Sequence, residues 1–75
     1  MHTSSIIDTY LIKALKFYPI DEFEHDLDQW KDFILEYVES EILRLTCDRF
    51  TKRYMLEISK LKIGELEYSQ DRLNA

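Results

Sequence analysis

Cysteine, glycine and proline each occur only once in this chain of 75 residues. A single cysteine cannot form a disulfide within the chain, and a single glycine cannot build the glycine-rich loop that holds phosphate groups in nucleotide-binding proteins. The two histidines, His2 and His25, lie far apart in the sequence with no cysteine cluster near either of them. We therefore expect neither a structural zinc site nor a cofactor.

Long apolar runs are also missing. No stretch approaches the roughly 18 uncharged apolar residues that would predict a membrane-spanning helix. The first residues, MHTSSII, lack the basic segment and apolar run that are typical of a secretory signal. A lone cysteine is typical of a reducing compartment. We therefore expect a soluble, cytoplasmic protein.

The small size of the chain limits its stability. A domain of this length buries only about 60% of the surface that its unfolded form exposes, and disulfides, metals or oligomerisation often supply the remaining stability. Since the sequence predicts neither a disulfide nor a metal, association is the remaining source. We expect a protein partner, and a homodimer in particular.

The composition, 45% apolar and 33% charged residues, is typical of a globular protein. The net charge of −5 is unevenly distributed along the chain. Residues 21–41 contain nine acids and one lysine, whereas residues 42–64 contain six basic residues and two acids. This segregation predicts an acidic second helix that packs near, or attracts, a basic third helix.

Apolar residues recur with helical spacing in three segments, which predicts a single all-α domain of three helices over residues 1–75. The first helix is expected over residues 5–18. It should end before Pro19, because a proline disfavours the α conformation in the residue before it.

The second helix is expected over residues 21–45, where Asp21 and Glu24 have the spacing of a helix cap and its partner. The third is expected over residues 48–63 with Asp48 as its cap, followed by a loosely attached tail over residues 65–75. An alternative for this end of the chain is a short hairpin in the segment KLKIGELEYS, in which apolar residues alternate around a two-residue turn at Gly64.

The third helix is expected to be apolar on two sides. One face is predicted to pack in the core, and it contains Cys47, Phe50, Tyr54, Ile58 and Leu61. Apolar residues off this face are a predicted contact surface for a second copy or another partner: Leu56, Ile63 and Leu66. A helix that is apolar on two sides needs two neighbours, and the core provides only one of them.

Two further sets of residues are candidate binding sites. The outer face of the second helix is a predicted acidic contact for a basic partner, formed by Asp28, Asp32, Glu36 and Glu39, with Leu43 at its edge. A basic stripe on the third helix is the alternative, a nucleic-acid contact through Arg49, Lys52, Arg53 and Lys60. With Phe50 and Tyr54 assigned to the core, base stacking is not expected there.

No catalytic arrangement is expected. Cys47 has two arginines near it that would favour a thiolate, but neither histidine is placed by the sequence to act as its base. At helical spacing from Phe50, the cysteine fits the role of a small apolar residue. We therefore expect a binding protein rather than an enzyme.

The segment YLIKALKFYPIDEFE, residues 10–24, resembles the first helix and turn of the Hha/YmoA nucleoid modulators. The resemblance implies a cytoplasmic, all-helical protein that binds the oligomerisation domain of H-NS-type silencers. DRFTKRYM, residues 48–55, stands where that family keeps a charged, leucine-bearing helix. The middle of the chain departs from the family, since DFILEYVESE, residues 32–41, continues as helix where the family has a polar loop.

These observations lead to one main hypothesis and one alternative. The main hypothesis is a small acidic helical protein that acts by protein–protein interaction in a regulatory or adaptor role and self-associates. The alternative is a nucleic-acid-associated or Hha-like nucleoid modulator that uses the basic stripe of the third helix.

Overall fold

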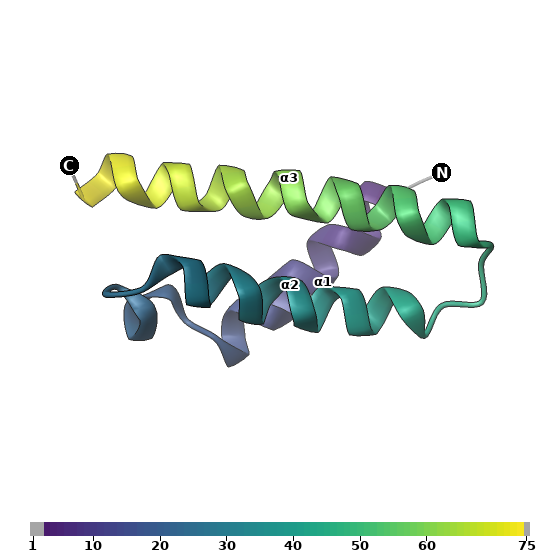
Figure 1. The fold of residues 1–75 in the computed structure, drawn as a ribbon, viewed down its shortest axis with the longest axis horizontal. Coiled ribbons are helices and arrows are strands. Elements are labelled where there is room, and N and C mark those ends of the chain that lie inside the picture. The colour runs from purple at the N-terminus through teal and green to yellow at the C-terminus, as the bar shows by residue number, and fades with distance from the viewer. Residues whose placement is uncertain (1–2, 75) are drawn as a thin grey trace.

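The computed structural model describes the backbone of residues 3–74 and the side chains of residues 5–68. Four elements follow one another along the chain: α1 (Thr3–Phe17), a short 3₁₀ helix η1 (Ile20–Phe23), α2 (Leu27–Leu43) and α3 (Arg49–Asn74) (Figure 1). No strand occurs within residues 3–74. The prediction of a small all-α domain with three main helices is confirmed.

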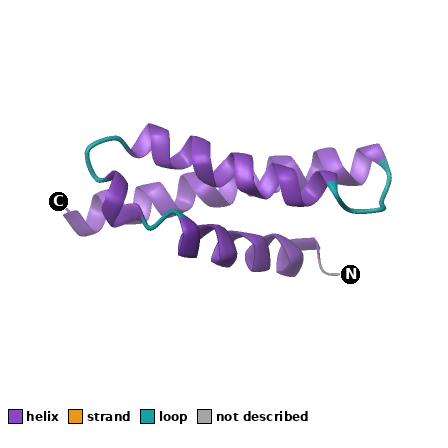
Figure 2. Ribbon diagram, turned by 90° about the horizontal axis from the view of Figure 1, so that it is seen from below, coloured by secondary structure: helices purple, strands orange, loops and turns teal. Residues whose placement is uncertain are grey.

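The helices α2 and α3 lie side by side and antiparallel, and α1 crosses this pair obliquely (Figures 1 and 2). The domain is elongated, with principal extents of 40 × 19 × 16 Å, because α3 is much the longest element. The α1 helix packs on both α2 and α3, so each of the three helices contacts the other two. One apolar core therefore lies between them.

The core contains nine buried apolar side chains drawn from all three helices. They are Ile7, Leu11, Ala14, Trp30, Ile34, Val38, Ile42, Met55 and Ile63. Their spacing on α1 and α2 is three to four residues, which places them on one face of each helix. The one polar residue among the described residues that is fully buried, Ser59, donates a hydrogen bond from its Oγ to the backbone carbonyl of Met55 at 2.8 Å.

The end of α1 is fixed by Pro19 and by an aromatic cluster beside it. Pro19 has extended backbone angles, as a residue outside a helix does. The Tyr18 ring stacks on Phe33 at a centroid distance of 5.2 Å and meets the edge of Phe23 at 6.4 Å. The Trp30 indole Nε1 donates to the backbone carbonyl of Tyr18 at 3.0 Å. These contacts tie α1 to the first turns of α2.

The start of α2 differs from the prediction. Asp21 belongs to η1, which has no side-chain cap, and the cap of α2 is Asp26, whose Oδ1 accepts from the backbone N–H of Gln29 at 3.0 Å. Asp21 with Glu24 and Asp26 with Gln29 have the same spacing, so local signals do not distinguish them. The chain uses the later cap, and Phe23 folds back onto Phe33 at 5.6 Å.

The C-terminal part of the chain also differs from the prediction. The α3 helix continues through Gly64 to Asn74, so the predicted end of the helix at residue 63 and the alternative hairpin are both wrong. Two ion pairs hold the later turns of α3 on the rest of the domain. Lys31 on α2 pairs with Glu67 at 3.1 Å, and Lys62 pairs with Asp8 on α1 at 2.8 Å.

The buried face of α3 is not the predicted one. Met55, Ser59 and Ile63 face the core, whereas Phe50 and Leu61 expose 80% and 66% of their surface. A serine in the middle of the true core face weakens its apolar pattern, and the bulkier residues of the opposite face give a stronger one. Burial of Ser59 leaves no hydrogen-bonding group unsatisfied, because its hydroxyl donates to a backbone carbonyl of its own helix.

Replacing Gly64 with alanine tests the continuity of α3. Gly64 has a negative φ, and a Cβ built on it meets nothing within 4 Å. Alanine should therefore raise the free energy of unfolding by about 0.5–1 kcal/mol, since glycine is unfavourable inside a helix. Urea denaturation at low protein concentration measures the change. A loss of stability would indicate the hairpin instead, because its turn requires a positive φ at Gly64.

Candidate protein-interaction surfaces

Two hydrogen bonds that involve side chains hold the connection between α2 and α3, residues 44–48. The Asp48 carboxylate accepts from the backbone N–H of Thr51 at 2.7 Å, which makes Asp48 the cap of α3. This bond holds the pKa of Asp48 below its ordinary value, so the carboxylate is ionised at neutral pH. The Lys52 Nζ reaches back to donate to the Leu43 backbone carbonyl at 3.0 Å, at the last turn of α2.

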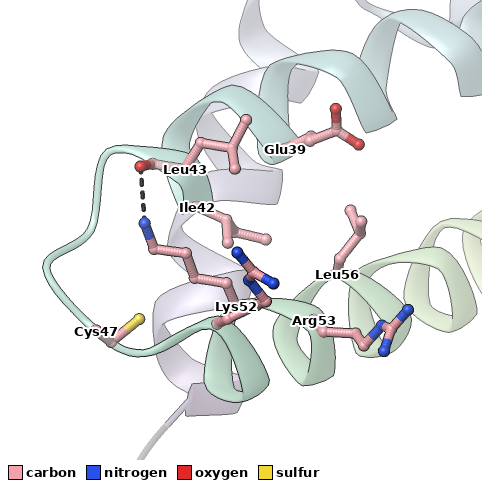
Figure 3. A pocket seen from close by; sticks show the side chains of 8 residues that line it. Glu39, Ile42, Leu43, Cys47, Lys52, Arg53 and Leu56 are labelled. Atoms are coloured by element: carbon pink, nitrogen blue, oxygen red, sulfur yellow. Dashed lines mark hydrogen bonds between the residues drawn. The ribbon is translucent and has the colours of Figure 1, made fainter.

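A groove of about 470 Å³ opens beside this connection, between the end of α2 and the start of α3 (Figure 3). We call it the corner groove. Eight residues line it: Glu39, Ile42, Leu43, Cys47, Arg49, Lys52, Arg53 and Leu56. Six of these eight residues were predicted from the sequence as members of the acidic face, the basic stripe or the apolar contact set. The fold therefore brings part of the acidic face, the basic stripe and the apolar set together in one place.

The corner groove is apolar inside and positive at its rim. Ile42 from α2 and Leu56 from α3 project into the space between the two helices, and Leu43 stands at the opening with 61% of its surface exposed. Three cations line the groove against one carboxylate. Lys52 is bonded to a carbonyl, whereas Arg49 and Arg53 make no ion pair within residues 5–68.

A second surface runs along the outer face of α3. Four large side chains are exposed there: Phe50, Tyr54, Leu61 and Tyr68, with exposed fractions of 80%, 57%, 66% and 63%. Their spacings of four, seven and seven residues place them within about 40° of one another around the helix, at about 100° per residue. We call this row the outer stripe. It lies opposite Met55, Ser59 and Ile63, the core face of α3.

The outer stripe was missed because three of its members were assigned to the core. The signal that identifies it is the repeat of seven residues from Tyr54 through Leu61 to Tyr68. Residues seven apart lie on one face of a helix, because two turns contain about seven residues. The core face of α3 instead has spacings of four, from Met55 to Ser59 to Ile63.

The acidic face of α2 is exposed to solvent. All four of its carboxylates lie on the side of the helix away from the core: Asp28, Asp32, Glu36 and Glu39. Only Asp28 has an ion pair among the described residues, with Lys31 at 3.6 Å. Docking of a basic partner on this face stays a prediction.

The predicted basic stripe is divided between different environments. Lys60 pairs with Glu57 on its own helix at 3.4 Å, and Lys52 is bonded to the Leu43 carbonyl. Arg49 and Arg53 remain available, and Phe50 and Tyr54 lie exposed beside them on α3. The prediction that these two aromatic rings face the core is wrong, so ring stacking is available next to the arginines.

The predicted apolar contact set is also divided. Leu56 lines the corner groove, and Leu66 lies half-buried between α3 and α1 beside Leu11 and Leu15. Ile63 exposes only 3% of its surface and belongs to the core, so its assignment to a partner contact is wrong. The exposed large apolar side chains of α3 are those of the outer stripe instead.

Neither a metal centre nor a membrane span emerges from the described residues. No three His, Cys, Asp or Glu side chains there are grouped as they would be around a metal ion. Within the same part of the chain, no helix combines the length and apolarity required to cross a bilayer. Cys47 is a free, half-buried thiol in the corner groove.

Comparison of the chain with models of known protein families, with curated proteins and with solved structures finds no match. Evidence for function therefore comes from the corner groove, the outer stripe and the acidic face of α2.

Proposed function

We propose that this protein acts by binding protein, in a regulatory or adaptor role in the cytoplasm, and that its first partner is a second copy of itself. The observation that carries the proposal is the outer stripe of α3. The proposed role is one of binding and includes no catalytic step.

A protein partner is favoured by the alignment of the outer stripe along α3. Single exposed apolar residues are common on protein surfaces, but four large ones aligned on one face of a helix form an apolar stripe that a partner can cover. Phe50 and Tyr54 are aromatic, and aromatic residues are enriched at protein interfaces. An α-helix apolar on two sides requires a neighbour on each side, and α1 and α2 both pack on the core side of α3.

A second copy is favoured by the charges that flank the stripe. The exposed charges in the first half of α3 include the cations Arg49, Arg53 and Lys60, and the second half carries the exposed Glu65. Lys62 and Glu67 of the second half are paired with α1 and α2. Two α3 helices packed antiparallel would bring the basic half of each beside the acidic half of the other. Parallel packing would bring like charges together. An antiparallel pair also has two-fold symmetry, which uses the same surface on both copies.

Substitution of Leu61 with glutamate tests self-association. We expect the wild-type protein to form dimers in the micromolar range and Leu61→Glu to weaken the dimer at least about tenfold, because a carboxylate would be buried in the pair. Sedimentation equilibrium measures the dissociation constant. Ile12→Glu is the matched control, since Ile12 is 58% exposed on α1 and lies outside the stripe.

Two results would contradict this account. One is a wild-type protein that remains monomeric at about 100 µM, a concentration that detects weak dimers. The other is a Leu61→Glu dimer as strong as that of the wild type. Because Leu61 is 66% exposed, the monomer of this variant should keep its fold, and circular dichroism checks this.

The acidic face of α2 is proposed to assist encounter with another chain. Asp32→Lys with Glu36→Lys should slow association and reduce its salt dependence, since charges of this kind act chiefly on the rate of encounter. Stopped-flow mixing at several salt concentrations measures both effects. The stability of the monomer should change by less than about 0.5 kcal/mol for each exposed substitution. Unfolding of the double variant would mean that these acids belong to the fold.

Nucleic-acid binding is the second candidate function. Arg49 and Arg53 lie beside exposed Phe50 and Tyr54, and single-stranded nucleic acids bind to such combinations of cations and stacking rings. A labelled single-stranded oligonucleotide at about 50 mM salt should then bind, and Arg49→Glu with Arg53→Glu should abolish the binding. Absence of binding under these conditions would eliminate direct contact. Binding to a purified H-NS-type oligomerisation domain is the separate test of the Hha-like alternative.

A further inference from the structure

We propose that the corner groove is a second binding site, which takes an acidic, amphipathic helical segment of another protein. The inference goes beyond self-association, because the groove lies between α2 and α3 and none of the outer-stripe residues lines it. Three features of the groove indicate this ligand: its lining, its charge and its shape.

The lining selects an apolar side chain. Ile42 and Leu56 form facing walls from the two helices, and Leu43 extends the apolar surface to the opening (Figure 3). The volume of about 470 Å³ lies within the range of about 300–1,000 Å³ that is typical of sites for small ligands. A leucine or phenylalanine side chain inserted there would gain apolar contacts that water cannot provide.

The rim selects an acidic partner. Arg49, Lys52 and Arg53 surround the opening with one carboxylate, Glu39, in a protein whose overall charge is −5. Lys52 is bonded to the Leu43 carbonyl, so the two guanidinium groups are the available donors. Guanidinium groups bind carboxylates through paired hydrogen bonds, which a lysine cannot do. An acidic side chain flanking the inserted apolar one would therefore be recognised.

The shape favours a peptide over a small amphiphilic molecule. The walls are partly open to solvent, because Leu43 is 61% exposed and both arginines are exposed. An open trough between two helices would leave much of a small molecule in water, whereas a helix can lay one apolar face along it. This is the geometry in which amphipathic helices bind grooves through residues three and four positions apart.

The test uses two labelled peptides of about 16 residues, which form about four turns when helical. Both carry leucine along one face, and the remaining positions are mainly glutamate in one peptide and lysine in the other. Fluorescence anisotropy measures binding to the full chain. We expect the glutamate peptide to bind in the micromolar range and the lysine peptide at least about tenfold more weakly.

Variants locate the site. Two variants should each weaken binding of the glutamate peptide at least about tenfold. One is the double variant Arg49→Glu with Arg53→Glu, and the other is Leu43→Asp. All three residues are exposed, so these variants should fold, and circular dichroism checks this. Lys60→Glu is the matched control, since Lys60 is a cation of α3 outside the groove, and it should change binding less than about twofold.

The outcomes separate this inference from the proposed self-association. Leu61→Glu, which disrupts the outer stripe, should leave peptide binding unchanged. The inference is overturned if the glutamate peptide does not bind at about 100 µM, if the unlabelled lysine peptide displaces it as well as unlabelled glutamate peptide does, or if the groove variants bind like the wild type. It is also overturned if laurate, a small acidic amphiphile, displaces the peptide and binds more tightly than it does.

Discussion

The structure depends on one constraint: a chain of this size covers only one side of its longest helix. The α1 and α2 helices both pack on the side of α3 that carries Met55, Ser59 and Ile63. The opposite side carries the outer stripe, in which Phe50, Tyr54 and Leu61 are largely exposed. Burial of this stripe would remove large apolar side chains from water, which is the main driving force of association. In the proposed dimer, the α3 helix of a second copy would cover that side.

The same arrangement explains why a groove forms at one end of the domain. Five residues connect α2 to α3, and their geometry is fixed by the Asp48 cap and by the bond from Lys52 to the Leu43 carbonyl. The aromatic cluster around Tyr18 lies at the other end of α2, where it joins the end of α1 to the start of α2. At the connection no third helix fills the space, and the side chains of α2 and α3 leave an opening with cations at its rim. The two proposed surfaces are thus consequences of where α1 ends and where it crosses.

Much of the fold is predictable from local chemistry, and the predictions that were wrong have physical causes. Pro19 and Asp48 are strong local signals, and both act in the structure as predicted. The face of α3 could not be predicted by apolarity, because burial is decided by which side meets α1 and α2. Ser59 is buried and Phe50 is exposed, the reverse of their hydrophobicities. The corner groove joins residues from two helices, so its residues were predictable individually and their convergence was not.

The central claim is that one face of α3 is buried in the core and that its exposed face binds a second copy. Hydroxyl-radical footprinting at several protein concentrations tests this claim most directly. Met55 is 1% exposed and should be protected from oxidation throughout, although methionine is an easily oxidised side chain. Phe50, Tyr54 and Leu61 should be oxidised rapidly in dilute protein and become protected as the concentration rises. Rapid oxidation of Met55 together with protected Phe50 and Tyr54 in dilute protein would contradict the account.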